Sequence, residues 1–279
     1  MKISQIAAQL YTLRDHLKTP ADIAKTLKKV RAIGYEAVQV SGMAPIDEDE
    51  LLQILDGEGL TCCATHEPGH VILDDIGKVI ERLQKLRCWY TAYPYPAGID
   101  FQNADHLETL ARKLDAAGAV MAQAGQVLAY HNHAHEFVRY QGQTVLDYIY
   151  ATTDPRHLQG EIDTYWIQAG GGDPAAWCRK LRRRLPLLHL KDYGCSADGK
   201  PYFAEIGQGN LDWPAIIAAA KASGCHWFIV EQDVCPGDPF ESLAISFRYL
   251  TENFAQPDDL SEAETAPGET LAKVTGSAA

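Results

Sequence analysis

The sequence alternates short apolar segments with longer amphipathic segments, and this alternation limits the fold more than any other feature. Through residue 254 the chain contains eight such pairs. A short apolar run predicts a buried strand, whereas apolar residues that recur every three or four positions predict one face of a helix. Strands and helices that alternate along a chain form parallel sheets covered by helices. Eight consecutive units predict a single-domain (β/α)8 TIM barrel, whose usual size is about 250 residues, rather than an open doubly wound sheet.

The boundaries of the predicted elements follow from the same periodicity and from the Gly and Pro residues between them. We expect strands at residues 3–13, 37–40, 60–65, 88–93, 127–133, 158–163, 185–192 and 227–233. We expect helices at residues 19–33, 47–58, 73–86, 104–123, 144–152, 174–184, 213–223 and 239–253. Together they form a barrel domain of residues 1–254. Residues 255–279 contain five acidic residues, one lysine and no apolar period, which predicts a disordered acidic tail.

The composition narrows the kinds of partner that this chain can have. The 279 residues carry a formal net charge of −12, and an acidic surface repels the phosphates of nucleic acids and of anionic lipids. No apolar window approaches the ~18 residues that a membrane span needs. The seven cysteines have no CxxC spacing, which is typical of free thiols in a reducing compartment. We therefore expect a soluble cytoplasmic protein without nucleic-acid or membrane partners, and we allow for a homo-oligomer.

The stretch YHNHAHEF, from Tyr130 to Phe137, has the densest group of candidate ligands in the chain. In an extended strand, residues two apart point the same way, so His131, His133 and His135 would share one face and Glu136 would follow at the strand end. A single histidine on an apolar face is usually an ordinary core residue. Several imidazoles and a carboxylate together are costly to bury without a metal or hydrogen-bonding partners. This pattern favours a metal or catalytic site.

Most of the other predicted strands also end in polar side chains. In a barrel of this kind the active site lies where the strands end at the C-terminal face. The residues at these ends are Gln9, Tyr11, His66, Glu67, Glu161, Asp163, His189, Lys191, Glu231 and Asp233. A structural protein would not need such a consistent arrangement.

Three of these residues combine with the histidine-rich stretch into a candidate metal site. Asp163, His189 and Glu231, with Glu136 or His131, form a mixed nitrogen and oxygen set, which suits one divalent ion: Mn²⁺ first, or Mg²⁺, Co²⁺, Fe²⁺ or Zn²⁺. Taken singly, each has an ordinary alternative, because Asp163 can cap a helix, His189 can bond a backbone carbonyl and Glu231 can pair with a lysine. Four such coincidences at successive strand ends are improbable.

Six motifs carry a resemblance that covers residues 3 to about 254. QLYTLRD, HNHAHEF, the DTYW that begins at Asp163, HLKD, GQGNLDW and VEQD together resemble the sugar phosphate isomerase/epimerase family, the xylose-isomerase-like barrels. The resemblance implies one divalent metal held by Glu, Asp, His and Glu from strands five to eight. These ligands would map to Glu136, Asp163, His189 and Glu231.

The sequence departs from the relatives at two places. Many members carry the strand-five glutamate inside the strand. At that place this chain has His131, and Glu136 follows five residues later. We nevertheless assign Glu136 as the ligand, with His131 and His133 facing the substrate. The AP endonucleases that share the barrel have a histidine three residues after the strand-six aspartate, where this chain has Trp166. Together with the negative charge, this argues against DNA repair.

The resemblance and the candidate ligands predict a metal-dependent isomerase or epimerase of a sugar or keto-sugar. A metal can polarise a ketose carbonyl and stabilise the enediolate that forms when the adjacent carbon loses a proton. We expect Glu136 and Glu231 to move that proton, with His131 or His133 as alternative bases. A metal-dependent dehydratase of a keto-polyol such as an inosose, and a non-catalytic carbohydrate-binding barrel, are the alternatives.

Five further side chains are expected to hold a small sugar or polyol. Lys191 and His66 would orient hydroxyl groups, and Gln9 ends the first strand at the same face. Trp166 and Tyr11 offer flat apolar surfaces to a sugar ring. The glycines at 170–172 are not followed by Lys-Ser or Lys-Thr, so a phosphate-binding loop is not supported and we expect an unphosphorylated substrate.

Overall fold

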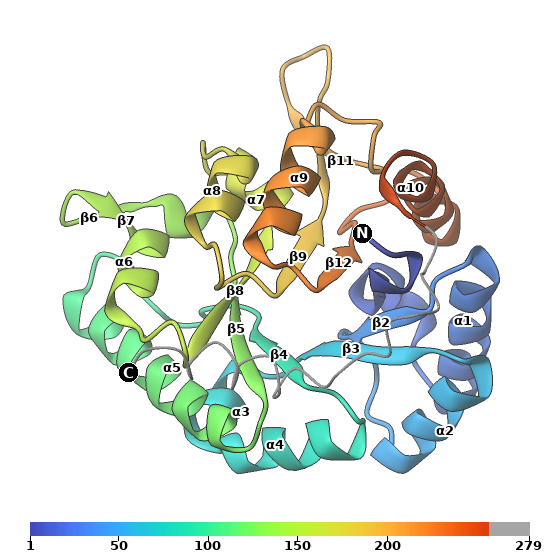
Figure 1. Ribbon diagram of the computed structural model, residues 1–279, viewed down its shortest axis with the longest axis horizontal. Helices are drawn as coiled ribbons and strands as arrows, with labels where there is room; N and C mark the ends of the chain where they lie inside the picture. The colour runs from blue at the N-terminus through green and yellow to red at the C-terminus, as the bar shows by residue number, and fades with distance from the viewer. Residues whose placement is uncertain (257–279) are drawn as a thin grey trace, which may run out of the picture.

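Eight parallel strands close into a barrel in the computed structural model, which describes residues 1–256 (Figure 1). The barrel strands are β1 (Ile6–Gln9), β2 (Ala37–Val40), β3 (Thr61–His66), β4 (Tyr90–Tyr93), β5 (Val127–His131), β8 (Leu158–Asp163), β9 (Leu187–Leu190) and β12 (Trp227–Val230). Each strand neighbours the next one along the chain, and β1 pairs with both β2 and β12 to close the ring. The predicted (β/α)8 fold is confirmed.

The helices lie outside the strands, as Figure 1 shows. They are α1 (Pro20–Ile33), α2 (Glu48–Glu58), α3 (Gly69–Asp74), α4 (Ile76–Lys85), α5 (Ala104–Gln123), α6 (Val145–Thr152), α7 (Thr164–Ala169), α8 (Pro174–Lys180), α9 (Trp213–Ser223) and α10 (Pro239–Phe254). Several begin with an oxygen that caps the first amides, for example Thr19 before α1 and Asp212 before α9. Their starts agree with the expected boundaries because capping residues and an N-terminal Pro are local signals.

Several predicted elements differ from the observed ones in their bounds, for example residues 174–184 against α8 and 185–192 against β9, and three further differences have a clear structural cause. The first strand is only β1, because the Gln9 side chain accepts a hydrogen bond from the amide of Tyr11 and starts the 3-10 helix η2 (Leu10–His16). The single helix predicted over residues 73–86 belongs to two helices, α3 and α4, which meet at Asp75, whose φ of −149° is not helical.

The third difference bears on the histidine-rich stretch. Strand β5 ends at His131, which is the last residue paired with β8, opposite Glu161. The chain then turns into the short 3-10 helix η3 (His135–Phe137). The expectation that His131, His133 and His135 share one extended face is therefore wrong.

Two hairpins interrupt the regular alternation and were not expected. One consists of β6 (Arg139–Tyr140) and β7 (Gln143–Thr144), and the other of β10 (Asp192–Cys195) and β11 (Pro201–Ala204). The carboxylate of Asp192 accepts hydrogen bonds from the amides of Gly207 and Gly209 and from Nε1 of Trp213. The motifs HLKD and GQGNLDW thus form one hydrogen-bonded unit. Glycine is required at position 209, because a Cβ there would lie 2.4 Å from Oδ1 of Asp192.

The core has two layers. The larger layer lies between the strands and the helices, and a smaller group of mostly small side chains, including Ala7, Ala37, Ala92 and Ala129, fills one part of the barrel interior.

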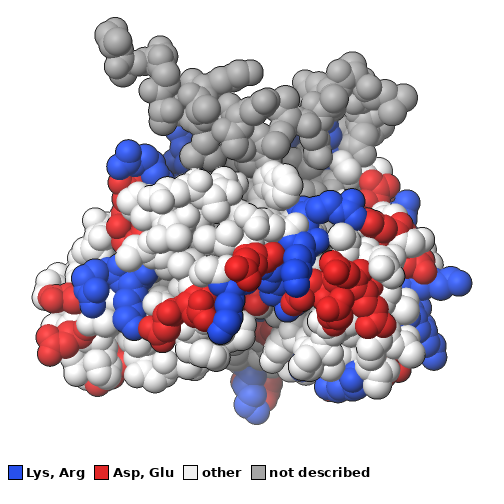
Figure 2. Space-filling model, turned by 90° about the horizontal axis from the view of Figure 1, so that it is seen from below, with Lys and Arg blue, Asp and Glu red and all other residues white. Residues whose placement is uncertain are grey.

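On the face in Figure 2, acidic and basic side chains are interspersed. None of the helices in the described part of the chain is long and apolar enough to cross a membrane. The predicted acidic tail, apart from Ala255 and Gln256, lies outside the described residues.

Candidate metal centre and active site

A buried polar network crosses the barrel interior beneath its C-terminal mouth. Gln39 of β2 lies at its centre: its Oε1 accepts a hydrogen bond from Nε2 of Gln9 at 2.7 Å, and its Nε2 donates to Oε1 of Glu161 at 2.6 Å. The other carboxylate oxygen of Glu161 lies 2.6 Å from Nε2 of His66. Nε2 of His189 lies 2.6 Å from Oε1 of Gln39. These contacts fix side chains from five strands before any ligand binds.

Four ligand side chains meet next to this network. One donor atom each from His131, Asp163, His189 and Glu231 lies within 4.8 Å of all the others. Nδ1 of His189 is 2.9 Å from Oε2 of Glu231 and 3.8 Å from Oδ2 of Asp163, and Nε2 of His131 is 3.9 Å from the same aspartate oxygen. All four residues are buried. Two imidazoles and two carboxylates in this arrangement match the ligand preferences of a catalytic divalent ion.

Asp163 has a structural role and still leaves one oxygen for a ligand. Its Oδ1 caps helix α7 by accepting a hydrogen bond from the amide of Trp166 at 3.0 Å. Its own amide donates to Oδ1 of Asn132, which holds the end of β8 against the β5 loop. Oδ2 is buried and has no well-aligned hydrogen-bond donor among the described residues, although Nζ of Lys191 lies 3.0 Å from it. A buried carboxylate oxygen of this kind favours a positive charge beside it, which Lys191 supplies here and a metal ion can also supply.

A second, overlapping set of donors is less suitable for a metal. His66, His131, Glu161 and His189 also bring one donor atom each within 4.8 Å of one another. Both oxygens of Glu161, however, already accept short hydrogen bonds, from Gln39 and from His66. The set that contains Asp163 is therefore the better candidate, and Glu161 serves to orient its histidines.

The two histidines of the candidate site have different charges. Burial and the neighbouring His189 together lower the pKa of His131 to about 3, so His131 is neutral at pH 7 and has a free lone pair. Burial also disfavours charge on His189, but the carboxylates of Glu161 and Glu231 outweigh it and raise the pKa of His189 to about 10. Both ring nitrogens of His189 face acceptor oxygens. His189 is thus an imidazolium that a metal would have to deprotonate.

Lys191 supplies a second positive charge at the mouth of the site. Its Nζ lies 3.0 Å from Oδ2 of Asp163, 2.9 Å from Oε2 of Glu231 and 3.0 Å from Oδ2 of Asp233, and the side chain is 1% exposed. Burial alone would lower the pKa of Lys191, but these carboxylates raise it well above its usual value. The ammonium group therefore stays charged, and it can donate to a substrate oxygen that takes the place of one of these three carboxylates.

Glu136 lies apart from the other predicted ligands. It is fully buried, accepts a hydrogen bond from the hydroxyl of Tyr130 at 3.0 Å, and accepts another from the amide of His133 at 2.8 Å. Successive residues of a strand point to opposite faces, so Tyr130 and His131 lie on opposite sides of β5. Glu136 lies on the same side of β5 as Tyr130, whose hydroxyl donates to it. The structure thus brings together Asp163, His189 and Glu231 with His131, and it does not bring Glu136 to them.

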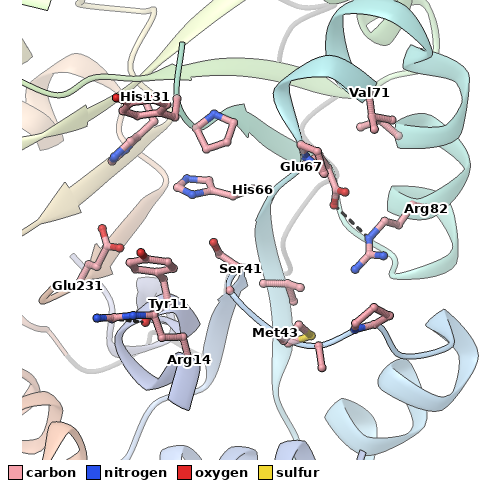
Figure 3. A pocket seen from close by; sticks show the side chains of 18 of the residues that line it. Tyr11, Arg14, Ser41, Met43, His66, Glu67, Val71, Arg82, His131 and Glu231 are labelled. Carbon is pink, nitrogen blue, oxygen red and sulfur yellow. Dashed lines mark hydrogen bonds and ion pairs between the residues drawn. The ribbon is translucent and has the colours of Figure 1, made fainter. Parts of the chain in front are cut away.

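A cavity of about 1220 Å³ opens above the candidate site. Figure 3 shows His66, His131 and Glu231 at one end of it, with Tyr11 beside them. Most of the predicted catalytic and substrate-binding residues line this cavity, namely Tyr11, His66, His131, His133, Trp166, Lys191 and Glu231. Gln9 and Glu136 are fully buried and do not line it.

Comparison with known proteins agrees with this architecture. The model of the family described as the xylose isomerase-like TIM barrel matches residues 27–252. This chain belongs to that family. The xylose-isomerase-like barrel is 23% identical over 272 residues to the inosose dehydratase of Lactiplantibacillus plantarum, an alignment that covers 84% of this chain and 90% of the relative.

Solved structures share the same xylose-isomerase-like fold. A sugar phosphate isomerase/epimerase from Parabacteroides distasonis superposes with a TM-score of 0.78 at 21% identity, over 91% of this chain and 96% of that one. The 3-keto-D-glucoside 4-epimerase of E. coli superposes with a TM-score of 0.63 at 16% identity, over 89% and 99% of the two chains. The resemblance inferred from the six motifs is confirmed.

Three contributors to the site of this xylose-isomerase-like barrel were missed or only partly recognised in the sequence. Gln39 was not singled out, although an amide alone within the apolar strand AVQV is a usable signal. Glu161 was noted only as a polar strand end. The pairing of Gln39 with a carboxylate 122 positions away could not be read from either segment. Phe203 of β11 also lines the cavity, and the hairpin that carries it had no distinct periodicity.

Proposed function

We propose that this protein is a metal-dependent isomerase or epimerase that moves a proton at the carbon next to the ketone of a sugar. The observation that carries the proposal is the buried group of His131, Asp163, His189 and Glu231 at the inner end of a large cavity, with the ammonium group of Lys191 beside it. A carbohydrate-binding protein without catalytic activity would have no use for so many buried charges, which are costly to maintain.

These four residues would hold one divalent ion, and His131 takes the place that the sequence analysis gave to Glu136. We propose Mn²⁺, with Mg²⁺, Co²⁺, Fe²⁺ or Zn²⁺ as the alternatives, because the donors are two imidazoles and two carboxylates. The ion would supply positive charge that polarises a carbonyl oxygen and stabilises an enediolate.

The side chains around the ion would handle the proton. Glu231, the residue after β12, and His133 from the β5 loop both line the cavity. Burial and the adjacent His131 together lower the pKa of His133 to about 2, so its imidazole is neutral at pH 7 and offers a free lone pair, although as a weak base. The side chain of Glu231 is ionised, because the attraction of Lys191 and His189 outweighs burial and holds its pKa well below the usual value. Bases that come from two different strand ends suit removal and return of a proton on different faces of a substrate.

Other cavity residues would position the substrate. Nζ of Lys191 can donate to a hydroxyl or carbonyl oxygen that replaces one of its carboxylate partners, and His66 also lines the cavity. Trp166, whose ring centroid is 5.5 Å from that of His133, offers a flat surface to a sugar ring. Glu136, which does not reach the cavity, would instead support the β5 loop through the amide of His133.

The proposal is tested by hydrogen exchange in D₂O. The protein is loaded with Mn²⁺ and incubated with a panel of ketoses and keto-sugars, and deuterium at the carbon next to the carbonyl is measured by NMR. We expect exchange that EDTA abolishes and that Glu231→Gln reduces by at least about 100-fold, since proton transfer by a positioned side chain is worth about 10²–10⁴ in rate. Exchange that is equally fast without metal would disprove the proposal.

A second candidate is dehydration of a keto-polyol. Two observations favour it: the similarity to an inosose dehydratase over 90% of that relative's length, and the 2.9 Å contact between Glu231 and Lys191. A carboxylate base next to an ammonium acid can remove a proton and protonate a departing hydroxyl on the same side of a substrate. Mass spectrometry of the product separates the two candidates, because a dehydratase releases one water and an isomerase or epimerase retains the mass of the substrate.

A further inference from the structure

The cavity continues well beyond the candidate metal centre. Its volume of about 1220 Å³ exceeds the 300–1,000 Å³ that is usual for a pocket enclosing a drug-sized ligand. A free keto-sugar is smaller than such a ligand. Figure 3 shows the cavity running from His131 and His66, past Ser41, to Met43, Val71 and Arg82. We call the far part the outer subsite and define it by Met43, Pro45, Ile46, Val71 and Arg82; charged side chains of α2 and α4, namely Glu48, Lys78, Glu81 and Lys85, also line the cavity.

We propose that the outer subsite binds a second ring, attached to the sugar whose ketone lies at the metal centre. The substrate would then be a glycoside or a similar conjugate rather than a free monosaccharide. This inference rests on the proposed function for the place of the keto-sugar, but the outer subsite itself can be tested by binding alone.

One wall of the outer subsite is the segment between β2 and α2. Gly42 has a φ of +67°, and a Cβ at this position would lie 2.7 Å from Cδ2 of Tyr11, so the segment passes over the tyrosine ring only because it has glycine there. The amide of Ala44 donates to the carbonyl of Leu17 at 2.9 Å. Met43 and Ile46 pack against the core and also line the cavity. The wall is therefore held in place and presents apolar groups.

The opposite wall combines apolar and cationic groups. Val71 of α3 is only partly buried and lines the cavity. Arg82 of α4 is held by two carboxylates, with Nη1 3.1 Å from Oε1 of Glu48 and Nε 3.1 Å from Oε1 of Glu67. An arginine fixed in this way keeps its guanidinium plane at the cavity, and such a plane stacks on flat rings. Apolar side chains on one side and a guanidinium on the other suit a ring with an apolar face.

The place where the candidate metal centre meets the outer subsite suits a substrate made of two linked rings. Tyr11 is 39% exposed at this point, and the guanidinium of Arg14 lies 4.5 Å from the centroid of its ring. Arg14 is itself held by the carbonyl oxygens of Tyr11 and Asp233. A sugar ring at the metal centre and a second ring at the outer subsite would therefore lie on either side of a fixed tyrosine. Both a second sugar and an aromatic aglycone have the apolar face that this geometry needs.

The first test compares three keto-hexosides in the hydrogen-exchange assay: a methyl glycoside, a phenyl glycoside and a disaccharide. We expect kcat/KM to be about tenfold or more higher for at least one of the two-ring substrates, because one buried ring face contributes at least that much. A phenyl preference identifies an aromatic aglycone and a disaccharide preference identifies a second sugar. Equal kcat/KM for all three substrates would overturn the inference.

Two variants and a control locate the preference. Val71→Trp and Pro45→Trp fill the outer subsite from its two walls. In each variant, kcat/KM for the two-ring substrate divided by kcat/KM for the methyl glycoside should fall to a value between about 1 and about 3. His70→Trp, on the same helix as Val71, changes an exposed residue that does not line the cavity, and it should leave the ratio unchanged. Thermal melting and metal content confirm that each variant is folded. A ratio that both filling variants leave unaltered contradicts the inference.

A binding experiment separates failure of this inference from failure of the proposed function. If no substrate exchanges, the proposed function fails, and unreactive methyl and phenyl β-glucosides are titrated into the Mn²⁺-loaded protein by calorimetry. The outer subsite predicts about tenfold tighter binding of the phenyl glucoside and loss of that difference in Val71→Trp. Equal affinities for the two glucosides, with no effect of the substitution, overturn the outer subsite itself.

Discussion

His131 and Glu136 lie five positions apart in the chain but on opposite sides of β5. We expect His131→Ala to weaken metal binding by at least about tenfold, because it removes a donor from the set. Loss of a residue that only supports a ligand typically lowers metal affinity by about 10–100-fold, and loss of a ligand itself lowers it at least as much. Glu136→Gln should weaken it by less than His131→Ala. Metal affinity is measured by calorimetry with Mn²⁺. The opposite order would restore Glu136 as the ligand.

The protonated state of His189 predicts how metal affinity depends on pH. The pKa of His189 is raised to about 10 in the metal-free protein, so the ring carries a proton at neutral pH that a metal at Nδ1 must displace. Protons compete with the metal below this pKa, and affinity therefore rises with pH, by about tenfold per unit for each proton released. Titrations between pH 6.5 and 8, in buffers of different ionisation enthalpy, measure the release. Affinity independent of pH would show that His189 does not lose a proton to the metal.

A substitution of Lys191 is expected to affect catalysis and metal binding differently. Its ammonium group lies within 3.0 Å of Asp163 and Glu231 and repels a cation placed between them. Lys191→Met keeps the length of the side chain and removes this charge, so we expect metal affinity to be retained or increased. Hydrogen exchange in the proposed substrate should fall by at least about 100-fold, as for loss of a positioned acid or base. Exchange at the wild-type rate would remove Lys191 from the proposed mechanism.

At the scale of elements, a single carboxylate joins the hairpin of β10 and β11 to the loop that follows it. Asp192 accepts hydrogen bonds from three backbone amides of the GQGNLDW motif and from Nε1 of Trp213. Asp192→Ala would leave buried donors without a partner, and we expect it to reduce the free energy of unfolding by about 3 kcal/mol or more. Urea unfolding measures this change. The exposed Asp198→Ala, in the turn of the same hairpin, is the matched control and should cost less than about 0.5 kcal/mol.

The structure also explains why some element boundaries were predictable. Helix α5 matches the predicted range of residues 104–123, because its amphipathic pattern and its Asn103 cap are local signals. The end of β5 was predicted two residues late, at His133. Its true end depends on pairing with β8, which is a contact between distant segments that periodicity does not record.

At the scale of the whole molecule, metal binding should stabilise the barrel. The candidate ligands come from the strands β5, β8 and β9 and from the residue after β12, and they would be dispersed in the unfolded chain. A ligand that binds only the native state adds about 2.7 kcal/mol at a free concentration of 100 times its Kd. We expect Mn²⁺ to raise the melting temperature of the EDTA-treated protein. The variant with His131→Ala should show a smaller rise, and equal melting curves with and without Mn²⁺ would argue against a native-state metal site.

The sequence by itself determined the barrel, the order of its strands and helices, and the polar character of its strand ends. These properties follow from local periodicity and from capping residues, which each segment carries independently. Only the tertiary structure decided that His131 rather than Glu136 joins Asp163, His189 and Glu231, and that Gln39 and Glu161 hold the histidines in place. The reason is geometric: the face that a side chain reaches depends on where its strand stops pairing, and pairing is set by a neighbouring strand far away in the chain.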